Sequence, residues 1–380
     1  EENSYTISID LDGNQLTRSA TVKDLAFETT KRVLVEEATG QGCGNCPSGI
    51  LAIENMQRLF GDQVVPVAVH STLMGADPYA DDNYVGWLGV TALPTGRVNR
   101  IDSIYAAIVS GMDPVTYENV YSFNGPTHSE TWLDIVQREF TNNPVADADV
   151  NITKADMNSS TGEITIEGNV NYAVNLNSLN QRLAFVITEN DLVGSQHNYY
   201  YSQTDPFFGE WGQGGMYGSA TVTYAYDHVS RSVIDNAYAG VSGLIPVSVT
   251  AGQPVEFSLT REAYQTVSNW SNAELVAILI DSNTGLVVNV NKVRFTIDGE
   301  TGIGSVDAVA EGADVQAVNG QIVVNAEGDV NVAVFDASGS LVGTAAGTGS
   351  VNVDVNSGRG LYIVKVTAGG ESAVKKVFVR

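Results

Sequence analysis

The stretch Arg32–Phe60, RVLVEEATGQGCGNCPSGILAIENMQRLF, decides the fold, because it predicts a strand, a glycine-rich loop and a helix in that order. Val33–Val35 have strand character, and the glycines that follow interrupt regular structure. Pro47 suits a first helical turn, where its missing N–H would be unpaired anyway. The apolar residues after it recur at helical spacing, at Ile50, Ile53 and Phe60, and are widened by Leu51 and Leu59.

Cys43 and Cys46 form a CxxC motif where the helix should begin, and they are the only cysteines in 380 residues. A thiol there faces unpaired N–H groups and the positive end of the helix dipole, which both favour the thiolate. We therefore expect Cys43 to be the accessible nucleophile and Cys46, one turn further in, to resolve mixed disulfides. Two alternatives stay open. One is a permanent disulfide, and the other is a zinc site, for which the four histidines are widely scattered.

Two segments resemble thioredoxin-like proteins: VLVEEATGQGCGNC at residues 33–46, and Gly89–Thr95, GVTALPT, which is similar to their cis-proline loop. The resemblance implies that Pro94 is cis, faces the CxxC and presents substrate backbone. It also implies that Glu37 is the buried acid that exchanges protons with the inner cysteine. An ordinary trans turn is the alternative for the proline. No metal or cofactor is expected.

The sequence departs from this family at two positions. Gly42 stands where many thioredoxins have Trp, and Asn45 replaces the Pro that is common inside reductase motifs. Both departures bear on the reduction potential and on the choice of partner.

Composition narrows the function classes. A length of 380 residues predicts two or three domains, and 43% hydrophobic against 17% charged residues indicates a globular chain. The formal charge of -25 disfavours nucleic acid and anionic membrane surfaces as partners. No run of about 18 apolar residues is present to span a bilayer. The chain starts at Glu1 without Met, so we expect a trimmed form from which a lipid anchor could have been lost.

The first 144 residues are expected to hold two parts. Residues 1–27 predict two strands around an Asp-Gly-Asn turn, either paired with the next domain or forming a hairpin. Residues 28–144 form the thioredoxin-like domain. In it Val64–His70 is nearly all apolar, as in a strand buried on both faces, and completes a βαβ unit. Arg97–Arg100 should pair antiparallel, and a helix over Thr131–Phe140 ends before Pro144.

Polar residues after the second strand have two interpretations each. His70 ends that strand, where side chains reach the ligand crevice of an open α/β sheet, or it is a strand-end residue without a role. Asp77, Asp81 and Asp82 could bind calcium, but their spacing matches no EF-hand loop. A solvated acidic face is the preferred interpretation.

Residues 145–298 alternate with period two, which predicts an antiparallel β-sandwich. One long segment, residues 192–227, is crowded with aromatic residues and glycines. Such a loop can be a platform for a glycan or peptide, with Tyr200, Trp211 and His228 as its candidate ligand-binding residues. It can equally be a satellite core that holds the loop down.

The same segment extends the resemblance. Leu192–Gly240, with Asp227–Arg231 as DHVSR and Gly96–Arg100 as GRVNR, resembles the 28-kilodalton outer membrane protein family. That family occurs in the envelopes of Gram-negative anaerobes and joins a thioredoxin-like head to a β-sandwich. The resemblance covers about residues 30 to 297. It implies export to the periplasm, outer membrane or cell surface.

The last part of the chain differs in composition. After a linker at Gly299–Gly304, residues 305–380 are poor in aromatics and predict a small β-sandwich of short strands. The segments Gly360–Val366 and Lys375–Val379 resemble the C-terminal sorting domain of type IX secretion cargo. A passive stabilising module is the alternative.

The sequence therefore predicts an α/β thioredoxin-like domain followed by two β-sandwiches. The leading hypothesis is a thiol–disulfide exchange module whose partners are protein thiols and disulfides of the envelope. The second is a surface binding or adhesion protein whose CxxC is only a staple, and the third is a purely structural envelope protein.

Overall fold

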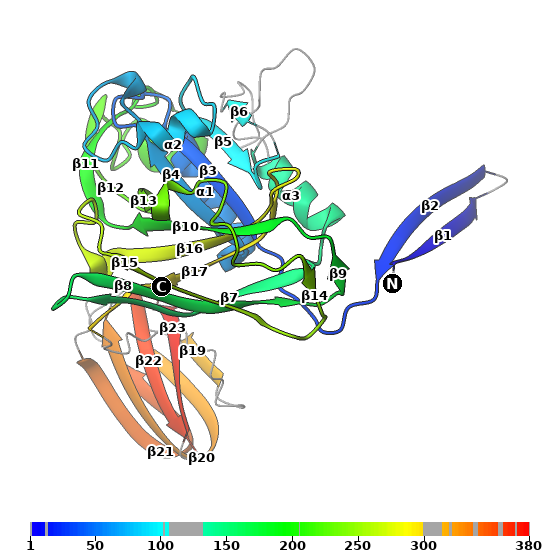
Figure 1. Cartoon of the computed structure of the whole chain (residues 1–380). Coiled ribbons are helices and arrows are strands. Elements are labelled where there is room, and N and C mark those ends of the chain that lie inside the picture. The colour runs from blue at the N-terminus through cyan, green and yellow to red at the C-terminus, as the bar shows by residue number, and fades with distance from the viewer. Residues whose placement is uncertain are drawn as a thin grey trace. The chain divides into compact units, whose positions relative to one another are not determined.

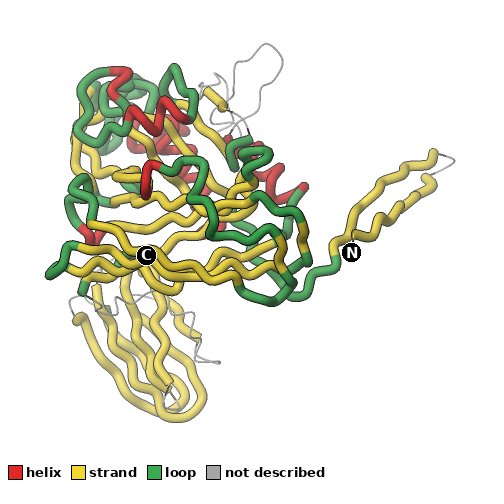
Figure 2. Tube along the Cα trace, in the orientation of Figure 1, coloured by secondary structure: helices red, strands yellow, loops and turns green. Residues whose placement is uncertain are grey.

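The computed structural model describes residues 2–11, 14–101, 103–105, 132–204, 206–298, 314–318, 321–336, 341–355, 360–368 and 371–379. The chain is mostly β (Figures 1 and 2) and divides into two compact units, Glu1–Glu300 and Thr301–Arg380. The expected linker at 299–304 lies outside the described residues. None of the described helices is both long and apolar enough to cross a membrane.

At the N-terminus, β1 (Glu2–Leu11) pairs antiparallel with β2 (Asn14–Lys23) in a two-stranded sheet of its own. Of the two arrangements expected for this leader, the separate hairpin is therefore the one present.

The predicted βαβ unit is confirmed. β3 (Val33–Thr39) and β4 (Val64–His70) are parallel and buried at every residue, and α1 (Pro47–Phe60) connects them. β5 (Thr95–Val98) then pairs antiparallel with β3, and β6 (Ser103–Tyr105) with β5. The apolar face of α1 is offset from the expected one, because Ala52, Ile53 and Met56 are buried and Leu59 is exposed.

The remaining helices are short. They are α2 (Asp82–Trp87), α3 (Trp132–Asn142), and 3-10 turns at Gly61–Gln63, Thr72–Met74, Pro206–Trp211, Ile234–Asn236 and Trp270–Asn272.

One eight-stranded sheet runs through most of the first unit, in the order β17-β16-β10-β13-β4-β3-β5-β6. The strands added from beyond residue 144 are β10 (Gln181–Glu189), β13 (Val229–Val233), β16 (Ala273–Asp281) and β17 (Val287–Arg294). The junction is narrow, since β13 runs parallel to β4 with Val229 opposite Ala68. Strands from both sides of the boundary expected at 144 thus belong to a single sheet.

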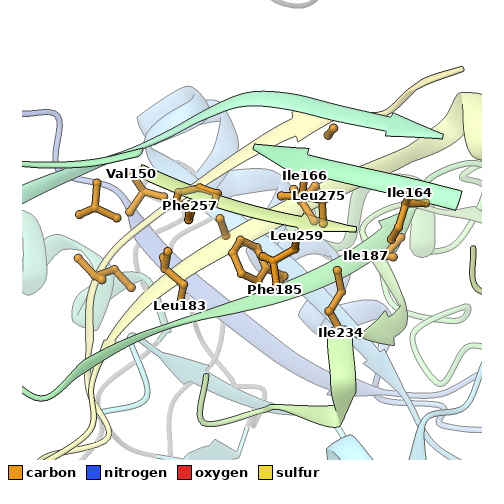
Figure 3. Packing of buried hydrophobic residues seen from close by; sticks show 14 of the residues in the cluster. Val150, Ile164, Ile166, Leu183, Phe185, Ile187, Ile234, Phe257, Leu259 and Leu275 are labelled. Atoms are coloured by element: carbon orange, nitrogen blue, oxygen red, sulfur yellow. The ribbon is translucent and has the colours of Figure 1, made fainter. Parts of the chain in front are cut away.

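A second sheet packs on part of the first, as the predicted sandwich requires. Its order is β15-β8-β7-β18, formed by Val255–Glu262, Glu163–Tyr172, Ala148–Asn158 and Thr296–Ile297. Along β8 exposed or half-buried residues alternate with buried ones. Figure 3 shows Ile164, Ile166 and Phe257 gathered with Phe185 and Ile187 of β10 between the two sheets.

The large sheet is covered on both faces. Alternate residues of β3 take opposite directions, so that Val33 and Val35 pack against α1 and α3 whereas Leu34 faces α2. On the Leu34 side, β3 and β4 share a core with β10, β16 and β17. The residues around the CxxC loop therefore stand on a rigid, fully buried support.

Two short strand pairs complete the first unit: β9 (Leu176–Asn177) with β14 (Ser248–Val249), and β11 (Leu192–His197) with β12 (Thr221–Tyr226).

The second unit is an antiparallel sheet with a valine-rich core. Its strands are β19 (Asp314–Val318), β20 (Gln321–Asp336), β21 (Leu341–Asp354), β22 (Gly360–Ala368) and β23 (Glu371–Val379). The long β20 pairs with β19, β21 and β22, so the expected short strands are joined in one sheet.

Candidate thiol–disulfide site

The two cysteines form a disulfide immediately before α1, with Cα atoms 5.3 Å apart. Cys46 is the N-cap residue, and Pro47 occupies the first turn as predicted. The backbone N–H of Cys46 donates to the carbonyl of Cys43, and those of Gly49 and Ile50 donate to the carbonyl of Cys46. Both cysteines are covered, with 1% of Cys43 and 0% of Cys46 exposed. The expectation of an accessible Cys43 is therefore wrong for this state of the molecule.

Glu37 is buried on the α1 face of β3. Burial raises the pKa of its carboxyl from 4.5 to about 8, although a hydrogen bond with Thr39 acts in the opposite direction. Its Oε1 has no hydrogen-bond partner among the described residues. The carboxyl group lies beneath the first turn of α1, where only the absence of a side chain at Gly49 leaves it room. Glu37 is thus a neutral acid next to the turn that begins at Cys46.

Pro94 adjoins the same loop from the other side. The Leu93–Pro94 peptide bond is cis, which confirms what the resemblance implies for this proline. The Leu93 side chain lies close to the backbone of Gly40 at the start of the CxxC loop. The cis-proline loop and the CxxC loop are therefore neighbours.

His70 and Asp77 support the loop from below. His70 Nδ1 is 2.8 Å from Asp77 Oδ2, both side chains are fully buried, and the same oxygen accepts a hydrogen bond from Gln41 N. Burial acts to raise the pKa of Asp77, but the hydrogen bond and charge of His70 and two backbone N–H donors outweigh it, and the pKa is lowered.

This arrangement corrects the interpretation of Asp77, whereas Asp81 is half-buried and Asp82 is exposed. Asp77 is buried rather than solvated, Asp81 caps α2 by accepting from Tyr84 N, and Asp82 accepts from Ser71 and Thr72. The described part of the chain holds no group of three or more His, Cys, Asp or Glu residues that could bind a metal ion.

The aromatic segment, residues 192–227, packs against the backbone of the CxxC loop. His197 N donates to Gln41 O and Tyr199 N to Gly44 O, each at 2.8 Å. The amide of the buried Gln196 donates to Cys43 O at 2.9 Å. The Tyr199 ring lies against Gly44, where a side chain would collide with it. Two stretches about 150 residues apart in sequence therefore form one site.

The residues expected to bind a ligand lie apart from any open platform. Tyr200 and Trp211 are only 3% and 1% exposed. Tyr200 stacks on Phe208, and Trp211 packs against Tyr217 and Tyr224. These covered rings fit the alternative of a satellite core, because a ligand platform requires exposed rings.

His228 lies elsewhere, next to α1. Its Nε2 is 3.2 Å from Gln57 Nε2, and its Nδ1 is 3.7 Å from the Glu274 carboxylate. Glu274 also pairs with Lys292 at 3.0 Å. Burial would raise the pKa of Glu274, but these partners hold it at about 2. The group connects α1 to β16, to β17 and to the residue that precedes β13.

Sequence reasoning missed Gln196 and Tyr199, and it gave Asp77 a different role. Their partners are the backbone of the CxxC loop, and no local pattern marks such a contact. The one available signal was Gly44, because a glycine inside a CxxC motif permits a close approach by another segment.

Comparison with known proteins gives a family for most of the first unit and another for the second. The family model described as Outer membrane protein Omp28 matches residues 81–298, and the Secretion system C-terminal sorting domain matches residues 318–380. No curated protein matches.

Two solved structures are similar to the chain. HBP35 of Porphyromonas gingivalis is 18% identical, covers 93% of this chain and 99% of its own, and has a TM-score of 0.45. Protein AGR_C_4864 from Agrobacterium tumefaciens is 14% identical and has a TM-score of 0.38. The match covers 73% of this chain and 99% of that protein. The Omp28 match spans more than half of the chain. The chain therefore belongs to the Omp28 outer membrane protein family and ends in a secretion sorting domain, as an exported protein of the cell envelope or cell surface.

Proposed function

We propose that residues 28–144 form a thioredoxin-like domain whose Cys43–Cys46 pair exchanges disulfides with proteins of the envelope. One observation carries the proposal: the disulfide sits at the start of α1, whose first turn covers a buried carboxyl with a pKa of about 8, and the loop of the cis proline adjoins the CxxC loop. A purely structural disulfide needs no such acid, and a buried carboxyl with one oxygen left without a hydrogen bond lowers stability. Perturbed pKa values of this kind are characteristic of functional sites.

The exchange proceeds in two balanced steps. The Cys43 thiolate attacks a partner disulfide, so that a Cys43–partner bond forms, the partner's S–S bond breaks and the leaving thiolate takes up a proton. Cys46 then attacks the Cys43 sulfur, which restores the Cys43–Cys46 bond and releases the second partner thiolate. Two electrons pass to the partner, and the reverse sequence oxidises it.

Glu37 is suited to the second step. Cys46 must lose a proton before it attacks, and a carboxylate with a pKa of about 8 holds protons nearly as strongly as an ordinary thiol of pKa about 8.5. The proton transfer is therefore almost balanced in free energy, which is the condition for efficient general base catalysis.

The test is to capture the intermediate. With Cys46→Ser the mixed disulfide at Cys43 cannot be resolved, so envelope proteins should co-purify with the variant under non-reducing conditions and be released by a reductant. The matched control is Cys43→Ser, which should capture nothing. Equal recovery from both variants, or none from either, would contradict the proposal.

A permanent staple is the second candidate, and the burial of both sulfurs favours it. It predicts no captured partner. It also predicts that the disulfide resists reduction while the chain is folded, regardless of how the covering segment is altered.

A further inference from the structure

We propose that Gln196–Tyr200, here called the strap, occupies the surface of the CxxC loop on which an extended, cysteine-bearing polypeptide binds. Exchange then begins when the partner displaces the strap. This inference rests on the proposed exchange function, and it names the class of substrate and the means by which access is controlled.

The first argument is the way the strap binds. Residues 197 and 199 both donate their backbone N–H to the loop, to Gln41 O and Gly44 O, while Asn198 between them points elsewhere and is buried. Alternate donors along one edge are the pattern by which an extended peptide adds to a protein backbone. The chain's own segment thus shows which groups of the loop a partner peptide would use.

The second argument is what the strap covers. Its contacts continue through Gln196, whose amide donates to Cys43 O, and Tyr200, whose hydroxyl lies 3.3 Å from Asn45 Oδ1. Cys43, Gly44 and Asn45 therefore each contact the strap, with the Tyr199 ring lying on Gly44. Cys43 is 1% exposed in this arrangement, so the proposal is that the strap moves off the loop before a partner sulfur reaches Cys43.

The third argument concerns the hydrogen bonds that hold the strap, because a partner peptide can replace the two that it makes with the loop. Asn198 anchors it to Trp211 O and Tyr217 O, and Tyr226 donates to Gln196 Oε1. Toward solvent, however, Tyr199 is 59% exposed. A main-chain hydrogen bond has a modest net value because water competes for the same groups. A peptide that makes the same two bonds therefore replaces the strap's main-chain contacts with the loop, while its remaining contacts have to offset the release of the buried Asn198 and Tyr200.

A small disulfide lacks this compensation. It has no run of backbone N–H groups with which to satisfy Gln41 O and Gly44 O after the strap has left. The substrate class is therefore an extended polypeptide with a cysteine, and low-molecular-weight disulfides should react slowly.

The first experiment measures access to the disulfide. Reduction of the full-length protein by a phosphine, which is itself oxidised to the phosphine oxide, is followed in the unaltered chain and in Tyr199→Ala. Loss of the ring that rests on Gly44 should speed reduction roughly 5- to 10-fold, the range for one aromatic contact. The matched control is Tyr201→Ala, an exposed neighbour, which should leave the rate unchanged. Equal rates of reduction in all three proteins would refute the proposal that the strap limits access to the disulfide.

The second experiment tests the partner and needs no variant. The reduced protein is mixed with an extended peptide that carries one activated disulfide, with the same peptide N-methylated at the two alternate residues, or with glutathione disulfide. The unmethylated peptide should oxidise the protein roughly 10-fold faster than either of the others, since it alone can donate both bonds. Equal rates for the three oxidants would refute the inference.

The outcomes separate the two proposals. If Cys46→Ser captures envelope proteins but methylation of the peptide has no effect, the proposed exchange function is supported and the proposed role of the strap is refuted. If the unmethylated peptide is preferred but no envelope partner is captured, the proposed role of the strap is supported and the proposed cellular function is refuted.

Discussion

Glu36 and Glu37 are adjacent residues of one buried strand, yet their side chains point to opposite faces of β3 and have different surroundings. Glu36 points toward α2, where Arg100 Nη2 lies 2.8 Å from its carboxylate and the Tyr84 hydroxyl donates to it at 2.5 Å. The same arginine donates to Tyr238 O, so the charge is fully enclosed by partners. Glu37 points toward α1, and one of its oxygens has no partner among the described residues.

The difference separates architecture from chemistry. A buried carboxylate that is paired with an arginine ties its strand to neighbouring elements. An unpaired one has its pKa raised into the range where protons are exchanged at neutral pH. Glu36 therefore serves the structure, and Glu37 is the one that we propose for proton transfer.

The largest effect should follow from breaking the paired side. In Glu36→Gln the guanidinium of Arg100 stays buried without a counter-charge, so the free energy of unfolding should fall by about 3–5 kcal/mol. Urea denaturation at neutral pH measures it. Asp235→Asn, which removes the charge from a half-exposed pair with Arg261, is the control and should cost less than about 1 kcal/mol. Similar losses for the two variants would show that the buried pair is not special.

The carboxyl of Glu37 should make the free energy of unfolding depend on pH. The pKa of Glu37 is raised on folding from 4.5 to about 8, so its neutral form is the one favoured by the fold. Its contribution is full below pH 4.5 and is lost as the pH rises toward 8. The slope is roughly 1.4 kcal/mol per pH unit, or roughly 3 kcal/mol between pH 5 and 7.

Glu37→Gln cannot ionise and should lose that slope, whereas Glu36→Gln should keep it. Denaturation curves at several pH values decide the point. The groups with lowered pKa, such as Glu274, act at more acidic pH and do not interfere in this window. Parallel pH profiles for the unaltered chain and Glu37→Gln would mean that the carboxyl is not neutral in the fold.

The same substitution should also slow the resolving step. A chromophoric thiol is attached to Cys43 of the reduced protein, and its release by Cys46 is followed. At about pH 8 roughly half of the Glu37 carboxyls are ionised and can accept the proton, so release there should be roughly 10²-fold slower in the variant, the lower end for general acid–base catalysis. Glu36→Gln, if folded, should release at the normal rate. An unchanged rate in Glu37→Gln would remove Glu37 from the mechanism.

The smallest effect is expected in the second unit, which serves as a reference. Among its described residues the core consists of apolar side chains, mainly valine, with Tyr362. The isolated fragment 301–380 should therefore fold and show a melting temperature that is nearly constant from pH 5 to 8. Calorimetry of the fragment tests this, and a fragment that is unfolded would show that its stability depends on the preceding unit.

Local pattern predicted much of the first unit. The buried strand Val64–His70, the helix start at Pro47 and the period-two strand around Ile164–Tyr172 were confirmed because neighbours in sequence determine them. The resemblance added the cis bond at Pro94, which spacing alone could not supply.

What the sequence could not predict depends on distant contacts. Aromatic residues such as Tyr200 and Trp211 have the same local appearance whether exposed or covered, and only the folded chain shows that they are buried. Asp77 sits among other acids in the sequence, yet it pairs with His70 beneath the loop. The single sheet shared by β4 and β13 likewise depends on a narrow junction between segments about 160 residues apart.

The reduction potential of the Cys43–Cys46 couple tests the central claim most directly. It is measured by equilibrating the full-length protein with thiol buffers of known potential and trapping the free thiols. An exchange module predicts a value between about -270 and -120 mV, the range of thioredoxin-like oxidoreductases. A value below about -300 mV, typical of structural disulfides, would contradict the account and identify the CxxC as a permanent staple.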